Sequence, residues 1–251
     1  MSVGDWIVLA LISLVVGFFI GSVGVGGILL IPALALFAGI DIHQATATAL
    51  FSFIFTGLAG TWLFQRRGSI DWKISLPILA GAMIFSYLGA KVNAMVSSHT
   101  LMQIIASLIF LAGVYVLLPT KNGGERFSHP LFRGRPLLLI LVGALSGFGS
   151  GLTGAGGPVF SVPMMLVLGF LPLTAIGASQ ALQIVAAVFG SFGNLQFGSI
   201  DYALAIGVTL FELIGIVAGA KAAHVASSIF LRRSAAGLCL ITGLIMLLRV
   251  I

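Results

Sequence analysis

Long runs of apolar residues, separated by short polar or glycine-rich breaks, dominate the chain. Ten runs are present, five on each side of a polar stretch, at about 5–21, 27–38, 44–64, 73–96 and 100–118, and at about 137–149, 157–169, 173–194, 202–226 and 230–250. Most have the roughly 20 residues that an α-helix needs to cross a bilayer. The strands of a transmembrane barrel would instead alternate apolar and polar residues. The pattern therefore predicts an all-α polytopic membrane protein with eight to ten membrane segments.

Composition supports the same class of protein. Hydrophobic residues make up 59% of the 251 residues and charged residues only 7%, whereas a soluble domain carries about 25% charged residues. The single cysteine, Cys239, excludes a disulfide scaffold. The net charge of +6 comes from basic residues in short loops at the ends of apolar runs. This placement is typical of the positive-inside rule and not of a nucleic-acid-binding surface.

The two sets of five runs read as an internal duplication with an offset of about 130 residues. Residues 68–71 and 198–201 both read Gly-Ser-Ile-Asp, and residues 89–91 and 219–221 both read Gly-Ala-Lys. The sequence thus predicts a first transmembrane repeat at 1–118, a polar basic linker loop at 119–136 and a second repeat at 137–251. Asp71 and Asp201 are expected to cap the helices that follow them, with Trp72 and Tyr202 as interfacial anchors.

The second run of each repeat is too short to span a bilayer, follows a glycine-rich stretch and contains a proline, Pro32 or Pro163. Such segments are typical of the broken helices of transporters. If the short segments cross, each repeat has five spans and the repeats are inverted. If they are re-entrant, each has four and the repeats are parallel. Five spans place ten of the twelve Lys and Arg residues on one side, which fits the positive-inside rule better. We expect inverted repeats, and the four-span alternative stays open.

The two glycine-rich breaks are the sharpest candidates for a binding site. The residues concerned are Gly24, Gly26 and Gly27 in the first repeat and Gly154, Gly156 and Gly157 in the second. A helix that begins at such a break offers free N–H groups and about half a positive charge to an anion. Two facing breaks would form an anion site without an arginine. The alternative is tight helix packing through small residues. Neither break continues into the Lys-Ser/Thr of a nucleotide P-loop.

Polar residues in the third run of each repeat are candidate hydrogen-bond donors to the same ligand. Thr48 and Ser52 share a helical face with Thr56, and in the second repeat the candidates are Ser179, Gln183 and Asn194, with Gln180 beside them. The alternative role is hydrogen bonding between helices.

Glu212 is the acid nearest the middle of an apolar run. A charge at that depth costs at least about 2.5–3.5 kcal/mol, so the residue is either protonated, paired or hydrated. We interpret Glu212 as a coupling residue for protons or sodium, and the alternative is a protonated packing residue. The first repeat has Ala82 at the equivalent position. No metal-ligand spacing and no nucleophile–base pair is found, so the sequence predicts no metal, no cofactor and no enzyme activity.

The pattern as a whole resembles the sulfite exporter TauE/SafE family, also called the 4-toluene sulfonate uptake permease family. The resemblance is carried by the glycine-rich stretch at 21–27, Pro32, the Ala-Thr-Ala-Thr-Ala-Leu run at 45–50, the Gly-Ser-Ile-Asp-Trp run at 68–72 and their copies. It implies a bacterial or archaeal permease of the cell (inner) membrane. Relatives are associated with sulfite, thiosulfate, sulfoacetate and other organosulfur anions, and the family is often described with eight spans.

We therefore expect a secondary transporter of a small sulfur-containing anion that works by alternating access between the two repeats. Its expected partners are that anion, membrane lipid and a coupling proton or sodium ion, with no nucleic acid. A passive anion channel would use the same residues without alternation. A non-transporting membrane scaffold subunit would use the polar residues only to pack helices.

Overall fold

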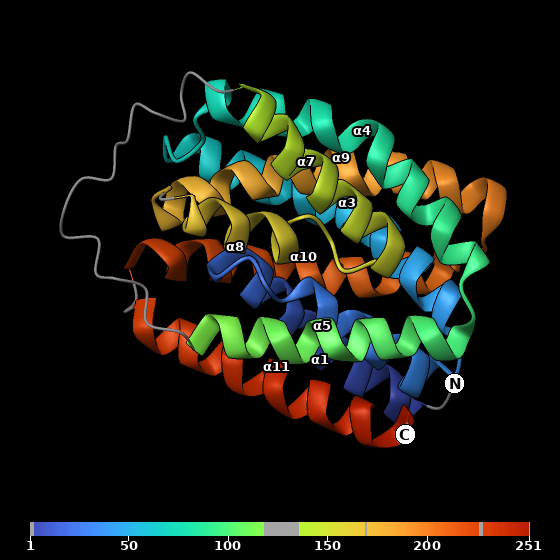
Figure 1. The fold of residues 1–251 in the computed structure, drawn as a ribbon. Helices are drawn as coiled ribbons and strands as arrows, with labels where there is room; N and C mark the ends of the chain where they lie inside the picture. The colour runs from blue at the N-terminus through green and yellow to red at the C-terminus, as the bar shows by residue number, and fades with distance from the viewer. Residues whose placement is uncertain (1–2, 118–135, 169, 226–227, 251) are drawn as a thin grey trace.

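The computed structural model describes residues 3–117, 136–168, 170–225 and 228–250, and every regular element in these ranges is a helix (Figure 1). The first half contains α1 (Val3–Ser22), η1 (Gly27–Leu29), α2 (Leu30–Ala33), η2 (Leu34–Ala38), α3 (Ile42–Arg66), α4 (Trp72–Met95) and α5 (Ser98–Leu117). The second half contains α7 (Pro136–Thr153), α8 (Pro158–Val167), α9 (Pro172–Phe197), α10 (Tyr202–Val225) and α11 (Ser228–Val250). The predicted linker at 119–136 lies, apart from Pro136, outside the described residues.

The expected all-α membrane architecture is confirmed. Seven helices of the described part are long and apolar enough to cross a bilayer, and three further apolar helical stretches are shorter, at Gly27–Ala38, Pro158–Val167 and Cys239–Leu248. The 10 residues of α8 extend about 15 Å at roughly 1.5 Å per residue, which is half of an apolar bilayer core of about 30 Å. The second segment of each half is therefore a half-length helix, as the sequence predicted.

The first helix of each half packs against the fourth helix of the other half. A Cβ at Gly17 of α1 would overlap the carbonyl oxygen of Glu212 on α10, and one at Gly21 would overlap Ile216. In the same way, Gly81 and Gly89 of α4 lie directly on the backbone of α7. Glycine lets two helix backbones approach this closely. The halves are thus interlocked through two parallel helix pairs, α1 with α10 and α4 with α7.

Corresponding helices of the two halves run in opposite directions. Gly60 of α3 packs on Gln180 of α9, whereas Gly190, further along α9, packs on Leu50, nearer the start of α3. The pair α5 and α11 is also antiparallel, since Gly113 contacts Leu240 and Gly243 contacts Phe110. The halves therefore have the inverted orientation that the sequence favoured, although their common origin by duplication stays a prediction.

The relative directions of the packed helices also show how many times each half crosses the bundle. Helix α3 runs parallel to α10, because the Asp201 N–H donates to Thr48 Oγ1 (3.0 Å) at one end and Arg67 donates to the Ala220 carbonyl (2.8 Å) at the other. Helix α1 is parallel to α10 as well, so the segment between α1 and α3 must return the chain across the bundle. Helices α7 and α9 are both parallel to α4, so the same holds for α8. Each half thus makes five traversals, and the four-span alternative is wrong for this fold.

The bundle has two chemically different ends. We name the end where α3 and α10 finish the basic end, because it carries Arg66, Arg67, Lys73 and Lys221. The opposite end, named the terminal end, holds the start of α1 and the finish of α11 (Figure 1). Lys91 lies near the terminal end of α4. By the positive-inside rule, the basic end is assigned to the cytoplasmic side.

The predicted helix starts at the two Gly-Ser-Ile-Asp motifs are confirmed. Asp71 Oδ1 accepts a hydrogen bond from the Lys73 N–H and Asp201 Oδ1 accepts one from the Leu204 N–H, both at 3.0 Å. Such caps satisfy backbone donors that the first helical turn leaves free. The aromatic residues that follow, Trp72 and Tyr202, are 39% and 47% exposed, as expected of interfacial anchors.

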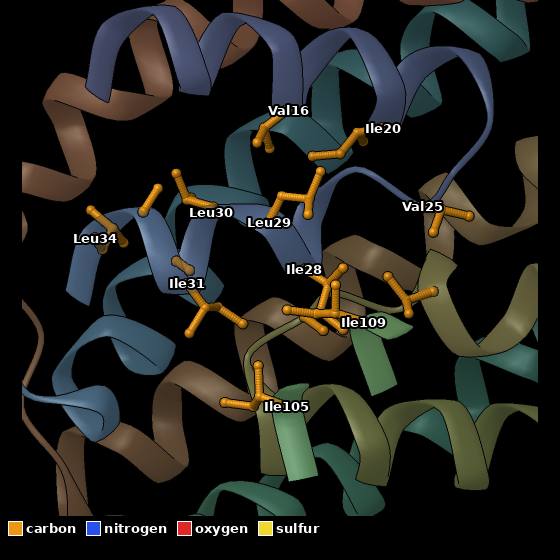
Figure 2. Packing of buried hydrophobic residues seen from close by; sticks show 14 of the residues in the cluster. Val16, Ile20, Val25, Ile28, Leu29, Leu30, Ile31, Leu34, Ile105 and Ile109 are labelled. Atoms are coloured by element: carbon orange, nitrogen blue, oxygen red, sulfur yellow. The ribbon is translucent and has the colours of Figure 1, made fainter. Parts of the chain in front are cut away.

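The largest apolar cluster surrounds the first short segment (Figure 2). Ile28 and Ile31 of that segment are completely buried, and they pack between Val16 on α1 and Ile105 and Ile109 on α5. Its residues 27–34 are all buried, whereas Leu36 is 50% exposed, so protein encloses the part of the segment that adjoins the break. This burial holds the first glycine-rich break in the interior of the bundle.

Candidate functional site

Both predicted helix breaks are present, and we name them loop 1 (residues 23–26) and loop 2 (residues 154–157). Gly24 in loop 1 has φ +82°, and Gly154 and Gly156 in loop 2 have φ +69° and +80°. Residues with a side chain rarely adopt these angles. Gly26, the counterpart of Gly156, has φ −70°, so its glycine provides room and not an unusual torsion: a Cβ there would overlap the Val16 carbonyl oxygen.

The two breaks meet in the interior, as the sequence predicted. A Cβ built at Gly27 would lie 2.8 Å from the carbonyl oxygen of Ala155 and 3.0 Å from Cζ of Phe53. A Cβ built at Gly156 would lie 3.3 Å from the same ring. The Phe53 ring is fully buried and therefore contacts both breaks at once. The helical periodicity of the sequence did not identify Phe53 as a candidate site residue.

Backbone N–H groups remain free at the start of each half-length helix. The N–H groups of Val23 and Gly24 both donate to the Phe19 carbonyl at 3.0 Å, and the Gly154 N–H donates to the Ser150 carbonyl at 2.8 Å. Within the described ranges no hydrogen bond forms from the N–H of Gly27 or Gly157. These donors belong to first helical turns, where partial positive charge accumulates.

Two of the predicted polar residues of α9 lie beside the breaks. Ser179 Oγ is 3.9 Å from the Cβ position of Gly24, and its hydroxyl donates to the Ile176 carbonyl at 2.7 Å. Gln183 Nε2 donates to Thr56 Oγ1 at 2.8 Å and to the Phe53 carbonyl at 3.3 Å. The backbone of Gln183 also lies against Gly157. Ser179 thus accompanies loop 1 and Gln183 accompanies loop 2.

Two of the three remaining predicted polar residues lie near one end of the bundle. Thr48 Oγ1 accepts the Asp201 N–H at the start of α10, and the Asn194 carbonyl accepts the Gly198 N–H (2.9 Å) at the end of α9. Both positions are near the terminal end, where these groups satisfy helix ends. The structure therefore does not bring Thr48 and Asn194 to the meeting point of the breaks.

Glu212 and Ser52 form a separate buried pair on α10 and α3. Both residues are 0% exposed, and the Ser52 side chain lies within hydrogen-bonding reach of the Glu212 carboxyl group. The Ser52 hydroxyl, however, donates to the Ala49 carbonyl at 2.8 Å, and neither Glu212 oxygen has a hydrogen-bond partner. A buried carboxyl group without a partner is costly in an apolar bilayer.

Two amides that the site prediction missed hold the helix ends before the breaks. Gln180 Nε2 donates to the Ile20 carbonyl at 3.1 Å, just ahead of loop 1. Asn93 Nδ2 donates to the Leu152 carbonyl at 2.6 Å, just ahead of loop 2. Gln180 stood beside the predicted stripe, but Asn93 belongs to no periodic pattern. Both bonds connect the two halves.

The chemistry available at the breaks is that of neutral donors. Among the buried polar side chains of the described ranges, Glu212 is the only one of a charged type, and the described residues contain no group of His, Cys, Asp or Glu suited to a metal ion. Backbone N–H groups remain, and the Gln183 amide and the Ser179 hydroxyl join them when they leave their present acceptors. This set can solvate the oxygens of a small anion without a buried cation.

Comparison with known proteins assigns this arrangement to one group of membrane proteins. The family model described as "Sulfite exporter TauE/SafE" matches residues 9–246. The chain is 30% identical over 244 residues to the probable membrane transporter protein YdhB of Bacillus subtilis (strain 168), which covers 92% of this chain and 98% of that protein. It is 26% identical over 229 residues to MJ0441 of Methanocaldococcus jannaschii (82% and 84% covered) and 26% identical over 215 residues to YfcA of Escherichia coli K12 (85% and 79% covered), both also named probable membrane transporter proteins. No solved structure matches the chain significantly.

Proposed function

We propose that this chain, which belongs to the sulfite exporter TauE/SafE family, is a secondary transporter that moves a small sulfur-containing anion by alternating access. Membership of this family shows the general class of the protein, which is a multi-pass membrane transporter. The substrate class we propose comprises sulfite, thiosulfate and organosulfonates. The observation that supports this proposal is the meeting of two helix breaks on one phenylalanine ring.

The proposed binding site lies where loops 1 and 2 meet. Each break presents free N–H groups at a helix start. We propose that Ser179 and Gln183 turn their side-chain donors from their present acceptors to the bound anion. A sulfur oxyanion carries several oxygens over a nearly spherical volume, so it can accept bonds from both breaks at once. Neutral donors hold such an anion less tightly than arginine would, which suits a site that must also release its ligand.

The inverted orientation of the halves supports alternating access. In an inverted pair, each conformation of one half has a counterpart in the other, so exchanging the two conformations moves the opening from one side to the other. In the present structure, both breaks are buried, and the Phe53 ring closes the space between them. We propose that the two halves rock about this contact. Glu212 then serves as the coupling residue, since it is the buried acid of the described helices.

The test is transport by the purified protein in liposomes. Labelled thiosulfate is a suitable probe, because it has no neutral, membrane-permeant form near neutral pH. We expect saturable uptake that is accelerated by thiosulfate on the opposite side, whereas a passive channel would show no such counter-transport. A scaffold subunit would show no uptake at all. A thermal-shift screen of sulfite, thiosulfate, organosulfonates and sulfate would rank the candidate ligands.

Variants of the donors localise the site. Gln183→Leu and Ser179→Ala should weaken thiosulfate binding, because each removes a neutral donor beside a break. Thr209→Val is a matched control, since its hydroxyl donates to the Ala205 carbonyl at 2.6 Å within α10 and is equally buried. Unchanged thiosulfate binding in both donor variants, with normal folding, would remove the breaks from the binding site.

A further inference from the structure

Side-chain oxygens without hydrogen-bond partners are concentrated on one side of the bundle. Seven residues of the described part have such buried oxygens. Five of them lie where α1, α3 and α10 pack together with the start of α9: Ser13, Ser22, Thr61, Gln180 and Glu212. The remaining two, Ser150 and Ser191, belong to α7 and α9. Buried polar groups in proteins are normally satisfied, and an unpaired one calls for a water, an ion or a functional reason.

The other four residues of this group lie on both sides of Glu212 along the bundle axis. Ser13, Gly17 and Gly21 follow one another at i, i+4 and i+8 on α1, and Gly17 lies on the backbone of Glu212. Ser13 is therefore one turn nearer the terminal end than Glu212. Gly21 lies on Ile216, one turn nearer the basic end, and Ser22 is the next residue on α1.

Gln180 continues the row toward the basic end. Its amide nitrogen donates to the Ile20 carbonyl on α1, while its Oε1 lies against Gly60 on α3, beside the Ile216 side chain. Thr61 is the next residue on α3. The unpaired oxygens of Ser13, Glu212 and Gln180 thus form a row along the contact of α10 with α1 and α3, and Ser22 and Thr61 are the residues next in the chain to Gly21 and Gly60. We name this contact the acidic seam.

We propose that the acidic seam is a hydrated path along which protons move to and from Glu212. Water molecules beside the unpaired oxygens supply the missing hydrogen bonds. A hydronium ion entering the path transfers its proton to a Glu212 carboxylate oxygen, which becomes a neutral carboxylic acid, and release of the proton to a water molecule of the path restores the carboxylate. The coupling of this step to anion movement rests on the proposed transport function, but the hydration of the seam does not.

No other titratable group faces Glu212 from the helices packed against it. The remaining ones on these helices lie in their terminal turns: Asp5 on α1, His43 and Arg66 on α3, and Tyr202, Lys221 and His224 on α10. Ser52 faces the carboxyl group instead, while Gly17 lies on the Glu212 backbone. The unpaired oxygens of the seam are spread over successive helical turns, so they do not converge on one point as the ligands of a metal cation do. Protons are therefore the ion that this arrangement fits.

Hydration of the seam is tested with silver ions, which are about the size of water and react with thiols. In a Cys239→Ala background, which has no other cysteine, we expect Ser13→Cys and Thr61→Cys to be blocked by silver ions before a maleimide is added to the denatured protein. The control is Ser86→Cys on α4, because Ser86 is 0% exposed and its hydroxyl donates to the Ala82 carbonyl at 2.7 Å. A Ser13→Cys thiol as inert as the Ser86→Cys thiol would overturn the proposal.

Coupling is tested with thiosulfate in proteoliposomes under an imposed pH gradient. We expect the wild-type rate to respond to the gradient, whereas the rate of Glu212→Gln, compared with its own rate without a gradient, does not change. A Glu212→Gln protein that is still driven by the gradient would overturn the role of the seam and leave the transport function intact. A wild-type protein that moves no sulfur anion would instead contradict the proposed function, while the silver-ion result would still decide the hydration of the seam.

Discussion

Gln183 and Phe53 stand 130 residues apart in the chain, and the Nε2 group of Gln183 donates a hydrogen bond to the Phe53 carbonyl at 3.3 Å. This separation equals the offset between the repeated motifs, so the two residues occupy equivalent positions in the two halves. Antiparallel helices that cross at equivalent positions place that crossing on the axis relating the halves. The amide of one half and the Phe53 carbonyl of the other thus meet on this axis, where we propose that the ligand passes.

Truncating Phe53 should open the contact between the two breaks. We expect Phe53→Ala to increase uncoupled thiosulfate flux in proteoliposomes, because the ring contacts both Gly27 and Gly156. Phe64→Ala is the matched control: Phe64 is also 0% exposed but lies beside His224 near the basic end. Both truncations should cost about 3–5 kcal/mol of stability. Equal flux through the two variants would contradict the gating role of Phe53.

Two glycines with the same backbone torsion should respond differently to alanine. Gly39 has φ +68° with nothing within 4 Å of an added Cβ, whereas Gly154 has φ +69° and its Cβ would lie 2.5 Å from the Thr46 carbonyl oxygen. Gly39→Ala should cost about 1–2 kcal/mol from torsion alone, and Gly154→Ala should cost more. Thermal unfolding in detergent measures the difference, and equal losses would show that the packing around loop 2 is looser than the structure indicates.

Removing the Asn93 amide should loosen loop 2. Asn93→Leu loses the bonds to the Leu152 carbonyl and to Thr46 Oγ1 (3.2 Å), and bonds between membrane helices contribute about 0.6–2 kcal/mol each. We expect faster amide hydrogen exchange at 152–157. Tyr87→Phe serves as the comparison, since it removes an exposed bond to Gln196. If loop 2 exchanges no faster in Asn93→Leu than in Tyr87→Phe, Asn93 does not hold it.

Both chain termini should lie on the side opposite the cytoplasm. Five traversals per half bring the ends of the chain to one side, and the basic end carries the Lys and Arg residues that favour the cytoplasm. A reporter that works only outside the cytoplasm should therefore be active when it is fused to the C-terminus. The same reporter should be inactive when it is inserted between Gly68 and Asp71. The reverse pattern of activity would invert the assigned orientation.

The apolar pattern predicted the helices and breaks well, because a bilayer allows few alternatives to a continuous helix. Asp71 and Asp201 were also predictable, since a helix cap is a local feature. The site was predicted less completely. Periodicity places Thr48, Ser52 and Thr56 on one face of α3, but small shifts along the helix decide which neighbour each one meets.

As a result, Thr48 meets the start of α10, Ser52 lies beside Glu212, and Thr56 meets Gln183. Asn93 and Phe53 had no local signal at all, because their roles arise only when the second half packs against the first. The number of crossings also needed the directions of α1 and α3 relative to α10, which no single segment of the sequence contains.

The exchange of partners between the halves has a consequence for how the protein is made. Helix α1 leaves the ribosome before α10, yet the face that carries Gly17 and Gly21 is completed only when α10 has been synthesised. Until then, this glycine-lined surface must be shielded by lipid or by the insertion machinery. The same exchange implies that separately expressed halves could be completed only by each other, so a chain cut between α5 and α7 should assemble from both fragments and from neither alone.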